Sequence, residues 1–125
     1  MIVGLGVDIA EINRIEAAIV RHGQPFIARL FTPAEIAYCE GFRHRYERYA
    51  GRFAVKEATM KALGTGWNRN VGWGEIEVVR QRGHAPTIKL SGKAAEFARK
   101  RGITGFHLSI THTVTTAMAH VIAEG

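Results

Sequence analysis

Apolar residues alternate with small or polar residues along the first part of the chain, and this period of two predicts a β-strand over residues 2–9. One face of the strand is apolar throughout, with Val3, Leu5, Val7 and Ile9. The opposite face consists of Ile2, Gly4, Gly6 and Asp8. Because the two glycines remove side chains beside Asp8, another backbone, a ligand or a hydrated ion can approach its carboxylate. The same pattern also allows Asp8 to cap the following helix together with Glu11, and one carboxylate can serve both roles.

The pattern changes to the helical period over residues 10–21. The inward stripe of this helix is Ile12, Ile15 and Ile19. The outward stripe is small and positively charged, with Arg14, Ala18 and Arg21. Such a stripe suits solvent, and it also suits an acidic partner, because positive patches steer association.

Two shorter segments lead to the centre of the chain. The sequence TPAE at residues 32–35 is a capping box with proline at the first helical position, which predicts a helix to about residue 40. Residues 41–48 are charged and aromatic with weak periodicity. We therefore expect a loop or irregular lead-in there.

Residues 51–66, GRFAVKEATMKALGTG, predict a helix that is apolar on most sides and carries its charges in two stripes. Glu57 and Lys61 share one stripe, and Arg52 and Lys56 share the other. Ionised groups on a buried helix are costly unless they are paired or bind an ion, so Glu57 and Lys61 are expected to line a cleft. A solvated ion pair between the two explains the same spacing.

The remaining pattern predicts two pairs of strands with a helix between them. These elements are expected at residues 76–80, 87–90, 91–101, 106–111 and 117–122. Gly64 fits a C-cap, and the glycine-rich stretch after it follows a helix C-terminus, so phosphate would have to be held by cations. The order of elements predicts an α+β fold in a single domain over residues 1–125, with a mainly antiparallel sheet and packed helices.

Composition narrows the class of protein. The chain has 125 residues, of which 46% are hydrophobic, and no apolar run approaches the length of a membrane span. Its single cysteine, Cys39, has no partner for an internal disulfide and suits a reducing compartment, so we expect a cytoplasmic protein. With 17 Lys and Arg against 11 Asp and Glu, the net charge of +6 favours polyanionic partners, which include nucleic acid, a phosphorylated cofactor and an acidic protein.

Three stretches closely resemble the holo-acyl-carrier-protein synthases, the short 4'-phosphopantetheinyl transferases. They are GLGVDIAEINRI near the start, GRFAVKEATMKALGTG in the middle and SITHT near the end. The resemblance covers nearly the whole chain. It implies transfer of 4'-phosphopantetheine from the substrate coenzyme A to a serine of apo acyl carrier protein for fatty acid biosynthesis, with Mg2+ as cofactor. It also implies a homotrimer with active sites between subunits.

The resemblance implies roles for particular residues. Asp8 and Glu57 would bind the metal and, with Lys61, form the catalytic set, in which Glu57 is also the candidate proton acceptor. The coenzyme contacts would be Arg52, Lys61, Gly64, His112 and Thr113, the last two supplied by a neighbouring subunit. The carrier protein would dock on Arg14, Ala18 and Arg21. Without the resemblance, the pattern favours His112 as a hairpin residue, because spacing fixes no partner for it.

One loop departs from the family. Residues 83–86 read Gly-His-Ala-Pro, where family members commonly have Gly-Lys-Pro or Gly-Arg-Pro. The resemblance therefore does not assign a nucleotide contact to this loop. The alternative to an enzyme is a small basic domain that binds nucleic acid without catalysis. Such domains interleave aromatic and basic residues or carry a recognition motif, and neither is clear here. We therefore expect no nucleic-acid or membrane partner.

Overall fold

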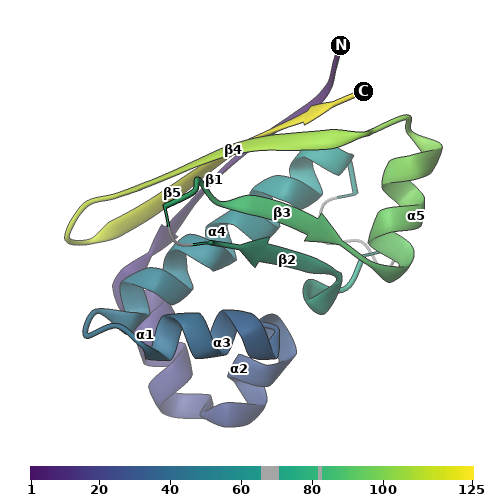
Figure 1. The fold of residues 1–125 in the computed structure, drawn as a ribbon. Helices are drawn as coiled ribbons and strands as arrows, with labels where there is room; N and C mark the ends of the chain where they lie inside the picture. Colours follow the sequence, from purple (N-terminus) through teal and green to yellow (C-terminus); the bar gives the residue numbers. More distant parts are fainter. Residues whose placement is uncertain (66–70, 82) are drawn as a thin grey trace.

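The computed structural model describes residues 1–65, 71–81 and 83–125 (Figure 1). Its elements are β1 (Ile2–Glu11), α1 (Ile12–His22), α2 (Gln24–Leu30), α3 (Pro33–Glu40), α4 (Arg45–Leu63), a 3-10 turn (Trp73–Glu75), β2 (Ile76–Val79), β3 (Thr87–Leu90), α5 (Gly92–Lys100), β4 (Gly105–His112) and β5 (Thr116–Glu124). Among the described residues, no helix is long and apolar enough to cross a membrane.

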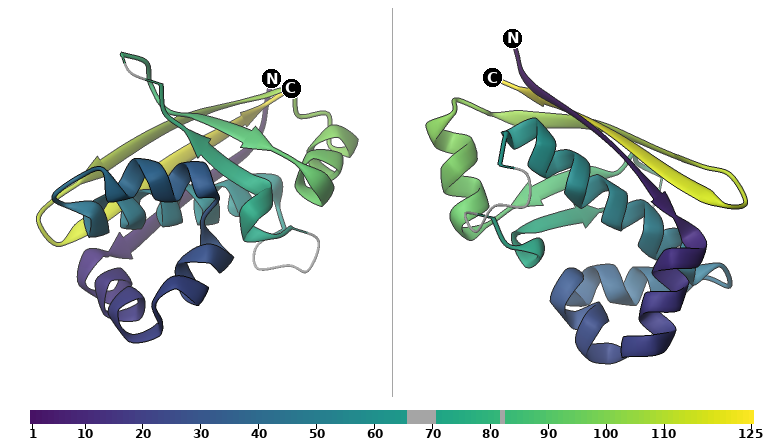
Figure 2. Two further views of the ribbon diagram at one scale, coloured as in Figure 1. Left: turned by 60° about the horizontal axis from the view of Figure 1, so that its bottom comes forward. Right: turned by 180° about the vertical axis from the view of Figure 1, so that it is seen from behind.

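The strands form two antiparallel sheets. The larger sheet has the order β1-β5-β4, and the smaller one is the hairpin of β2 and β3. Helix α4 lies between them, with the large sheet on one side and the hairpin and α1 to α3 on the other (Figures 1 and 2). The predicted α+β class with antiparallel strands is confirmed, although the strands divide into two sheets.

Strand β1 lies directly on the backbone of α4. A Cβ atom built on Gly6 would overlap the carbonyl oxygen of Ala58, and one built on Gly4 would overlap that of Ala62. The close approach of another backbone, predicted from the two glycines, is therefore confirmed. It fixes Asp8, the next residue on the same face of β1, against α4.

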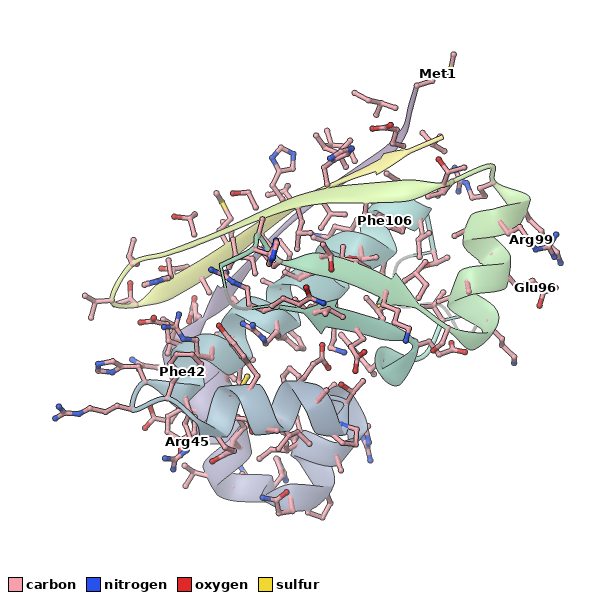
Figure 3. All side chains as sticks on the ribbon, in the orientation of Figure 1. Met1, Phe42, Arg45, Glu96, Arg99 and Phe106 are labelled. Atoms are coloured by element: carbon pink, nitrogen blue, oxygen red, sulfur yellow. The ribbon has the colours of Figure 1, made fainter. Side chains whose placement is uncertain are left out.

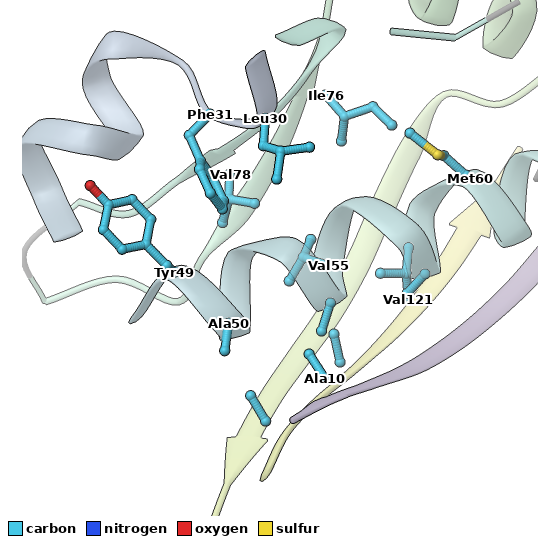
Figure 4. Close-up of a cluster of buried hydrophobic side chains, with 14 of the residues drawn as sticks. Ala10, Leu30, Phe31, Tyr49, Ala50, Val55, Met60, Ile76, Val78 and Val121 are labelled. Carbon is cyan, nitrogen blue, oxygen red and sulfur yellow. The ribbon is translucent and has the colours of Figure 1, made fainter. Parts of the chain in front are cut away.

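The core surrounds α4 because this helix buries side chains in several directions. Figure 4 shows Tyr49 and Val55 of α4 near Phe31 and Val78, and Ala50 on the side of the large sheet. An alanine stripe faces the sheet, with Ala50, Ala54, Ala58 and Ala62 each no more than 2% exposed. These small side chains allow the helix and sheet backbones to approach closely.

The start of α4 differs from the prediction. The helix begins at Arg45, so the loop predicted over residues 41–48 is wrong for its second half. Tyr49 is fully buried and its hydroxyl donates to Glu40 Oε2 at 2.7 Å, while the guanidinium of Arg48 lies 4.3 Å from the centre of the Phe42 ring. These contacts with α3 and the segment after it stabilise a turn of helix whose own sequence has weak periodicity.

The boundary between β1 and α1 also differs. Strand pairing continues through Glu11, which lies opposite Thr116, and α1 begins at Ile12 rather than near residue 10. Glu11 occupies the N-cap position and makes no side-chain capping bond. The alternative in which Asp8 and Glu11 form a capping box is therefore wrong, because Asp8 lies inside the strand.

Candidate active site

Asp8 and Lys61 meet where β1 crosses α4. Lys61 Nζ lies 3.2 Å from Asp8 Oδ1 and donates to the carbonyl oxygen of Val7 at 2.9 Å. The Asp8 side chain is 12% exposed, whereas the Lys61 side chain is 50% exposed. The carboxylate is thus mostly enclosed, with an ammonium group at its solvent side.

Glu57 lies one helical turn before Lys61 on the same stripe of α4, and it is half-buried. The contact between Lys61 and Asp8 means that this stripe follows the strand that carries Asp8. Two carboxylates and an ammonium group therefore come from two elements that the glycine contact holds together. The sequence predicted the stripe, but it could not place Asp8 beside it without the family resemblance.

The carboxylates suit a magnesium ion. Magnesium prefers hard oxygen ligands and is commonly held by one or two protein carboxylates, with waters and substrate phosphates as the remaining ligands. Among the described residues, no group of three or more His, Cys, Asp and Glu side chains is placed to hold a metal. The donor set of Asp8 and Glu57 fits magnesium shared with a phosphorylated substrate, and it does not fit an all-protein metal cage.

The second charged stripe of α4 has a different environment. Lys56 is fully buried, with its Nζ 2.8 Å from Glu35 Oε1, and it also donates to the carbonyl oxygens of Trp73 and Ile76. Burial lowers the pKa of Lys56, and the neighbouring Glu35 carboxylate opposes that shift. Lys56 therefore joins α4 to α3 and β2 and does not face a substrate.

Glu35 has a larger role than its sequence pattern indicates. The predicted capping box is confirmed, since Thr32 N donates to Glu35 Oε1 at 2.8 Å and Glu35 N donates to Thr32 Oγ1 at 3.2 Å. Its Oε2 atom also accepts the Val78 amide at 2.8 Å. Glu35 is buried together with Lys56, and no local pattern identifies this pairing because the two residues lie on different helices.

Arg52 is only 5% exposed, and its guanidinium lies 4.0 Å from the centre of the Tyr38 ring. Its Nε atom is buried without a hydrogen-bond partner in the described part of the chain, and the same is true of Arg48 Nε. Buried donors without acceptors are costly, so two such groups on one side of α4 fit a site for an anionic ligand. Arg48 was not among the predicted site residues.

The remaining predicted coenzyme contacts lie elsewhere. His112, at the end of β4, has its Nε2 atom 3.3 Å from Glu47 Oε1 near the start of α4, and Thr113 Oγ1 accepts amides within the hairpin turn. Glu47 precedes Glu57 by about 15 Å along the helix axis. A single chain therefore does not bring His112 into contact with Lys61.

Gly64 and the predicted carrier-docking residues have clear positions. Gly64 ends α4 in the left-handed conformation at φ 81°, as its C-cap pattern predicts, and Arg101 Nη1 donates to the neighbouring carbonyl of Leu63 at 2.6 Å. Arg14 and Arg21 are exposed on α1. Ala18 lies between them and is half-buried. Residues 66–70 of the glycine-rich stretch and residue 82 lie outside the described residues.

Comparison with models of known protein families shows to which proteins this chain is related. The sequence model of the 4'-phosphopantetheinyl transferase superfamily matches residues 4–115. The chain belongs to this superfamily. Within it, the chain is 54% identical over 124 residues to the holo-[acyl-carrier-protein] synthase of Solibacter usitatus and 48% identical over 124 residues to that of Koribacter versatilis, with 99% of each chain covered in both comparisons.

Solved structures of transferases from this superfamily have the same fold. The holo-[acyl-carrier-protein] synthase of Neisseria meningitidis matches with a TM-score of 0.91 and 31% identity over 100% of both chains. The Helicobacter pylori enzyme, solved in complex with coenzyme A, matches with a TM-score of 0.85 and 32% identity, covering 96% of this chain and 99% of that one. The predicted family and fold class are confirmed.

Proposed function

We propose that this protein is a holo-acyl-carrier-protein synthase, which transfers 4'-phosphopantetheine from coenzyme A to a serine of apo acyl carrier protein and releases 3',5'-ADP. The modified carrier would then serve fatty acid biosynthesis. The full-length similarity to enzymes of that name carries the proposal. The contact between Asp8 and Lys61, on the stripe of α4 that also carries Glu57, supports it with residues of the matching chemistry.

The reaction needs concentrated positive charge. The carrier serine attacks the β-phosphorus of coenzyme A, the bond to the leaving 3',5'-ADP breaks, and the serine loses its proton. Mg2+ held by Asp8 and Glu57 would neutralise pyrophosphate charge and favour in-line displacement. Lys61 would offset the charge that develops on the transferred phosphate. Glu57 is the candidate proton acceptor, and that role competes with metal binding for its oxygen atoms.

Further residues would hold the coenzyme. Arg52 would bind a second phosphate, which would supply an acceptor for its buried Nε atom. Gly64, at the end of the helix that carries Lys61, would let the coenzyme pass close to the backbone. His112 and Thr113 of a neighbouring subunit would complete the contacts from the hairpin turn.

The large sheet supports a homotrimer. Its face opposite α4 exposes Leu5, Val7 and Ile9 of β1 by 59%, 48% and 62%, with Met118 of β5 beside them at 37%. Figure 3 shows side chains on this side of the sheet with no element of the described chain above them. A contiguous apolar face of this kind marks an association surface, and we assign it to two further copies of this chain.

The separation of His112 from Lys61 within one chain supports active sites between subunits. His112 is held near the start of α4, whereas Lys61 lies near its end. A neighbouring copy whose hairpin turn reaches the Asp8 region would supply the missing contact. The site would then be complete only in the assembly.

We place the carrier protein on the exposed outward stripe of α1, formed by Arg14, Ala18 and Arg21. An acidic carrier would be attracted by the two arginines, and the small alanine would let a helix approach closely. We place the enzyme in the cytoplasm, where its carrier would be made and its thiol would stay reduced. Burial raises the pKa of the Cys39 thiol to about 12, which supports a packing role for this residue rather than a chemical one.

A mass measurement tests the activity. Purified protein is incubated with apo acyl carrier protein, coenzyme A and Mg2+, and the carrier is analysed by intact mass spectrometry. We expect the mass of one phosphopantetheine group to be added, and we expect chelator to abolish the gain. Absence of modification with saturating substrates and metal would contradict the proposal.

A further inference from the structure

His120 occupies the middle of the exposed face of the large sheet. It lies on β5, the central strand, directly between Val7 of β1 and Ser109 of β4. Met118 and Ile122 precede and follow it on the same face of β5. His120 is thus surrounded by strand positions on all four sides, and it is itself exposed.

The surroundings of His120 contain few competing groups. Its ring makes no hydrogen bond or ion pair with any residue in the described ranges. The charged neighbours on this face are His107 and Glu124, which pair with each other at 2.6 Å, and the exposed Glu11 at the end of β1. A shallow hollow of about 200 Å³ is lined by His107, Leu108, Ser109, His120 and Ile122. An unpartnered imidazole therefore stands beside a small space, with Val7, Met118 and Ile122 as its apolar neighbours.

We propose that three copies of His120 form a metal site on the threefold axis of the homotrimer, one that binds a single divalent transition metal ion of the zinc class. This inference rests on the trimer in the proposed function. In a ring of three chains that close around this face, side chains stand roughly perpendicular to the sheet. The central residue of the central strand then points at the axis, where it meets its two symmetry copies.

The chemistry of such a cluster favours a transition metal. Three imidazoles are an established ligand set for zinc, with the fourth position filled by water or another small ligand. Imidazole also suits copper and nickel, whereas magnesium prefers oxygen, so this site would not compete with Asp8 and Glu57 for magnesium. Ser109 lies on the strand position opposite His120, and its hydroxyl would serve as the acceptor for the second ring N–H of a metal-bound imidazole.

A metal at this position would stabilise the assembly rather than take part in the transfer. One ion would bind residues from all three chains and none of the residues assigned to the coenzyme. Binding would therefore increase the stability of the trimer relative to separated chains, because the complete ligand set exists only in the trimer.

Metal titration of the intact protein tests the inference. The protein is freed of metal with chelator, its mass is measured by light scattering, and Co2+ or Zn2+ is added without coenzyme A or magnesium. We expect one ion per three chains, a visible absorption spectrum typical of tetrahedral Co2+, and a higher melting temperature with Zn2+. His120→Gln should remove all three effects at an unchanged trimer mass. His107→Gln, the matched control on the same face, should keep them.

Each alternative outcome refutes a specific part of the inference. A trimer without binding, binding of one ion per chain, or binding that survives His120→Gln refutes the histidine site and leaves the trimer and the transferase activity intact. A monomeric protein refutes the trimer together with the site. Loss of the phosphopantetheine transfer described above would count against the enzyme and not against metal binding.

Discussion

Lys56 and Glu57 are adjacent in α4 but have different roles. Lys56 is buried against three oxygen atoms, those of Glu35, Trp73 and Ile76, whereas Glu57 is half-buried on the stripe of Lys61. Successive helical residues point about 100° apart, so neighbours can serve the core and the site. The Lys56 ion pair holds the helix in place, while Glu57 lies on the stripe that we assign to the metal and substrate.

The first prediction concerns this buried pair. Lys56→Met leaves the Glu35 carboxylate buried without its counter-charge, and Glu35→Gln leaves the ammonium in the same position. We expect each change to lower the free energy of unfolding by about 3–5 kcal/mol. The double variant should lose clearly less than the sum of the two, as measured by urea unfolding. Strict additivity would show that the two groups are independent.

The second prediction concerns the proposed metal ligands. Asp8→Asn and Glu57→Gln remove charge without changing size, so we expect turnover to fall by roughly two orders of magnitude or more at limiting magnesium. Stability should change by less than about 1 kcal/mol for Asp8→Asn, because its partner Lys61 is half exposed. Glu96→Gln, an exposed carboxylate change on α5, is the control. Normal rates in both site variants would place the metal elsewhere.

At the scale of elements, the contact between β1 and α4 determines the geometry of the site. Gly4 and Gly6 of β1 bring the strand against the helix backbone. On the helix, the alanine stripe of α4 has only small side chains, which allows the same close approach. Asp8 and Lys61 are far apart in the sequence, and this contact brings them together. The precision of the site therefore depends on positions that carry no functional side chain.

The third prediction follows from that contact. A Cβ at Gly6 would overlap the Ala58 carbonyl oxygen, so Gly6→Ala must move the strand away from the helix. We expect a loss of about 1–3 kcal/mol in the free energy of unfolding. We also expect reduced turnover, since Asp8 moves with the strand. Gly105→Ala in β4 is the control, because nothing lies within 4 Å of a Cβ built there. Equal stability of the two variants would contradict this account.

The fourth prediction concerns α1. Arg14→Glu reverses charge on the exposed stripe assigned to the carrier protein. The KM for acyl carrier protein should rise several-fold and become less dependent on salt, while coenzyme A affinity and Tm stay nearly constant. Arg99, which Figure 3 labels, lies on helix α5 away from α1, and Arg99→Glu should change neither constant. If coenzyme A affinity falls as far as carrier affinity, Arg14 belongs to the nucleotide site.

At the scale of the whole molecule, one face of the large sheet packs on α4 and the other is exposed and apolar. The hairpin that carries His112 extends from this sheet beyond the region of Asp8 (Figure 1). Burial of the apolar face by copies of the chain would therefore also bring hairpins to neighbouring sites. Assembly and completion of the site would then be one event.

The fifth prediction tests this link by mixing subunits. Lys61→Ala and His112→Ala should each have little activity as homotrimers. After the two proteins are mixed and their subunits exchanged, we expect about one quarter of wild-type activity, since each site would draw on two chains chosen at random. If each site belongs to one chain, mixing should restore nothing. Light scattering before and after exchange checks that trimers are present.

The sequence predicted most elements because their patterns are local. The stripe of Ile12, Ile15 and Ile19 is buried as expected, and the Thr32 capping box is present. The start of α4 and the burial of Lys56 with Glu35 could not be predicted, because both depend on contacts between separate elements. Alternation along β1 likewise could not show that its apolar face would be exposed, since either face could have met the helix.

The position of β5 in the large sheet affects synthesis of the protein. This strand lies between β1 and β4 but follows both in the sequence. On the ribosome, β1 therefore has no sheet partner until β5 has emerged, and its backbone amides and carbonyls lack sheet hydrogen bonds during most of translation. Exposed apolar strands are prone to aggregate. The nascent chain should consequently depend on chaperones that bind its first strand until the last one is released.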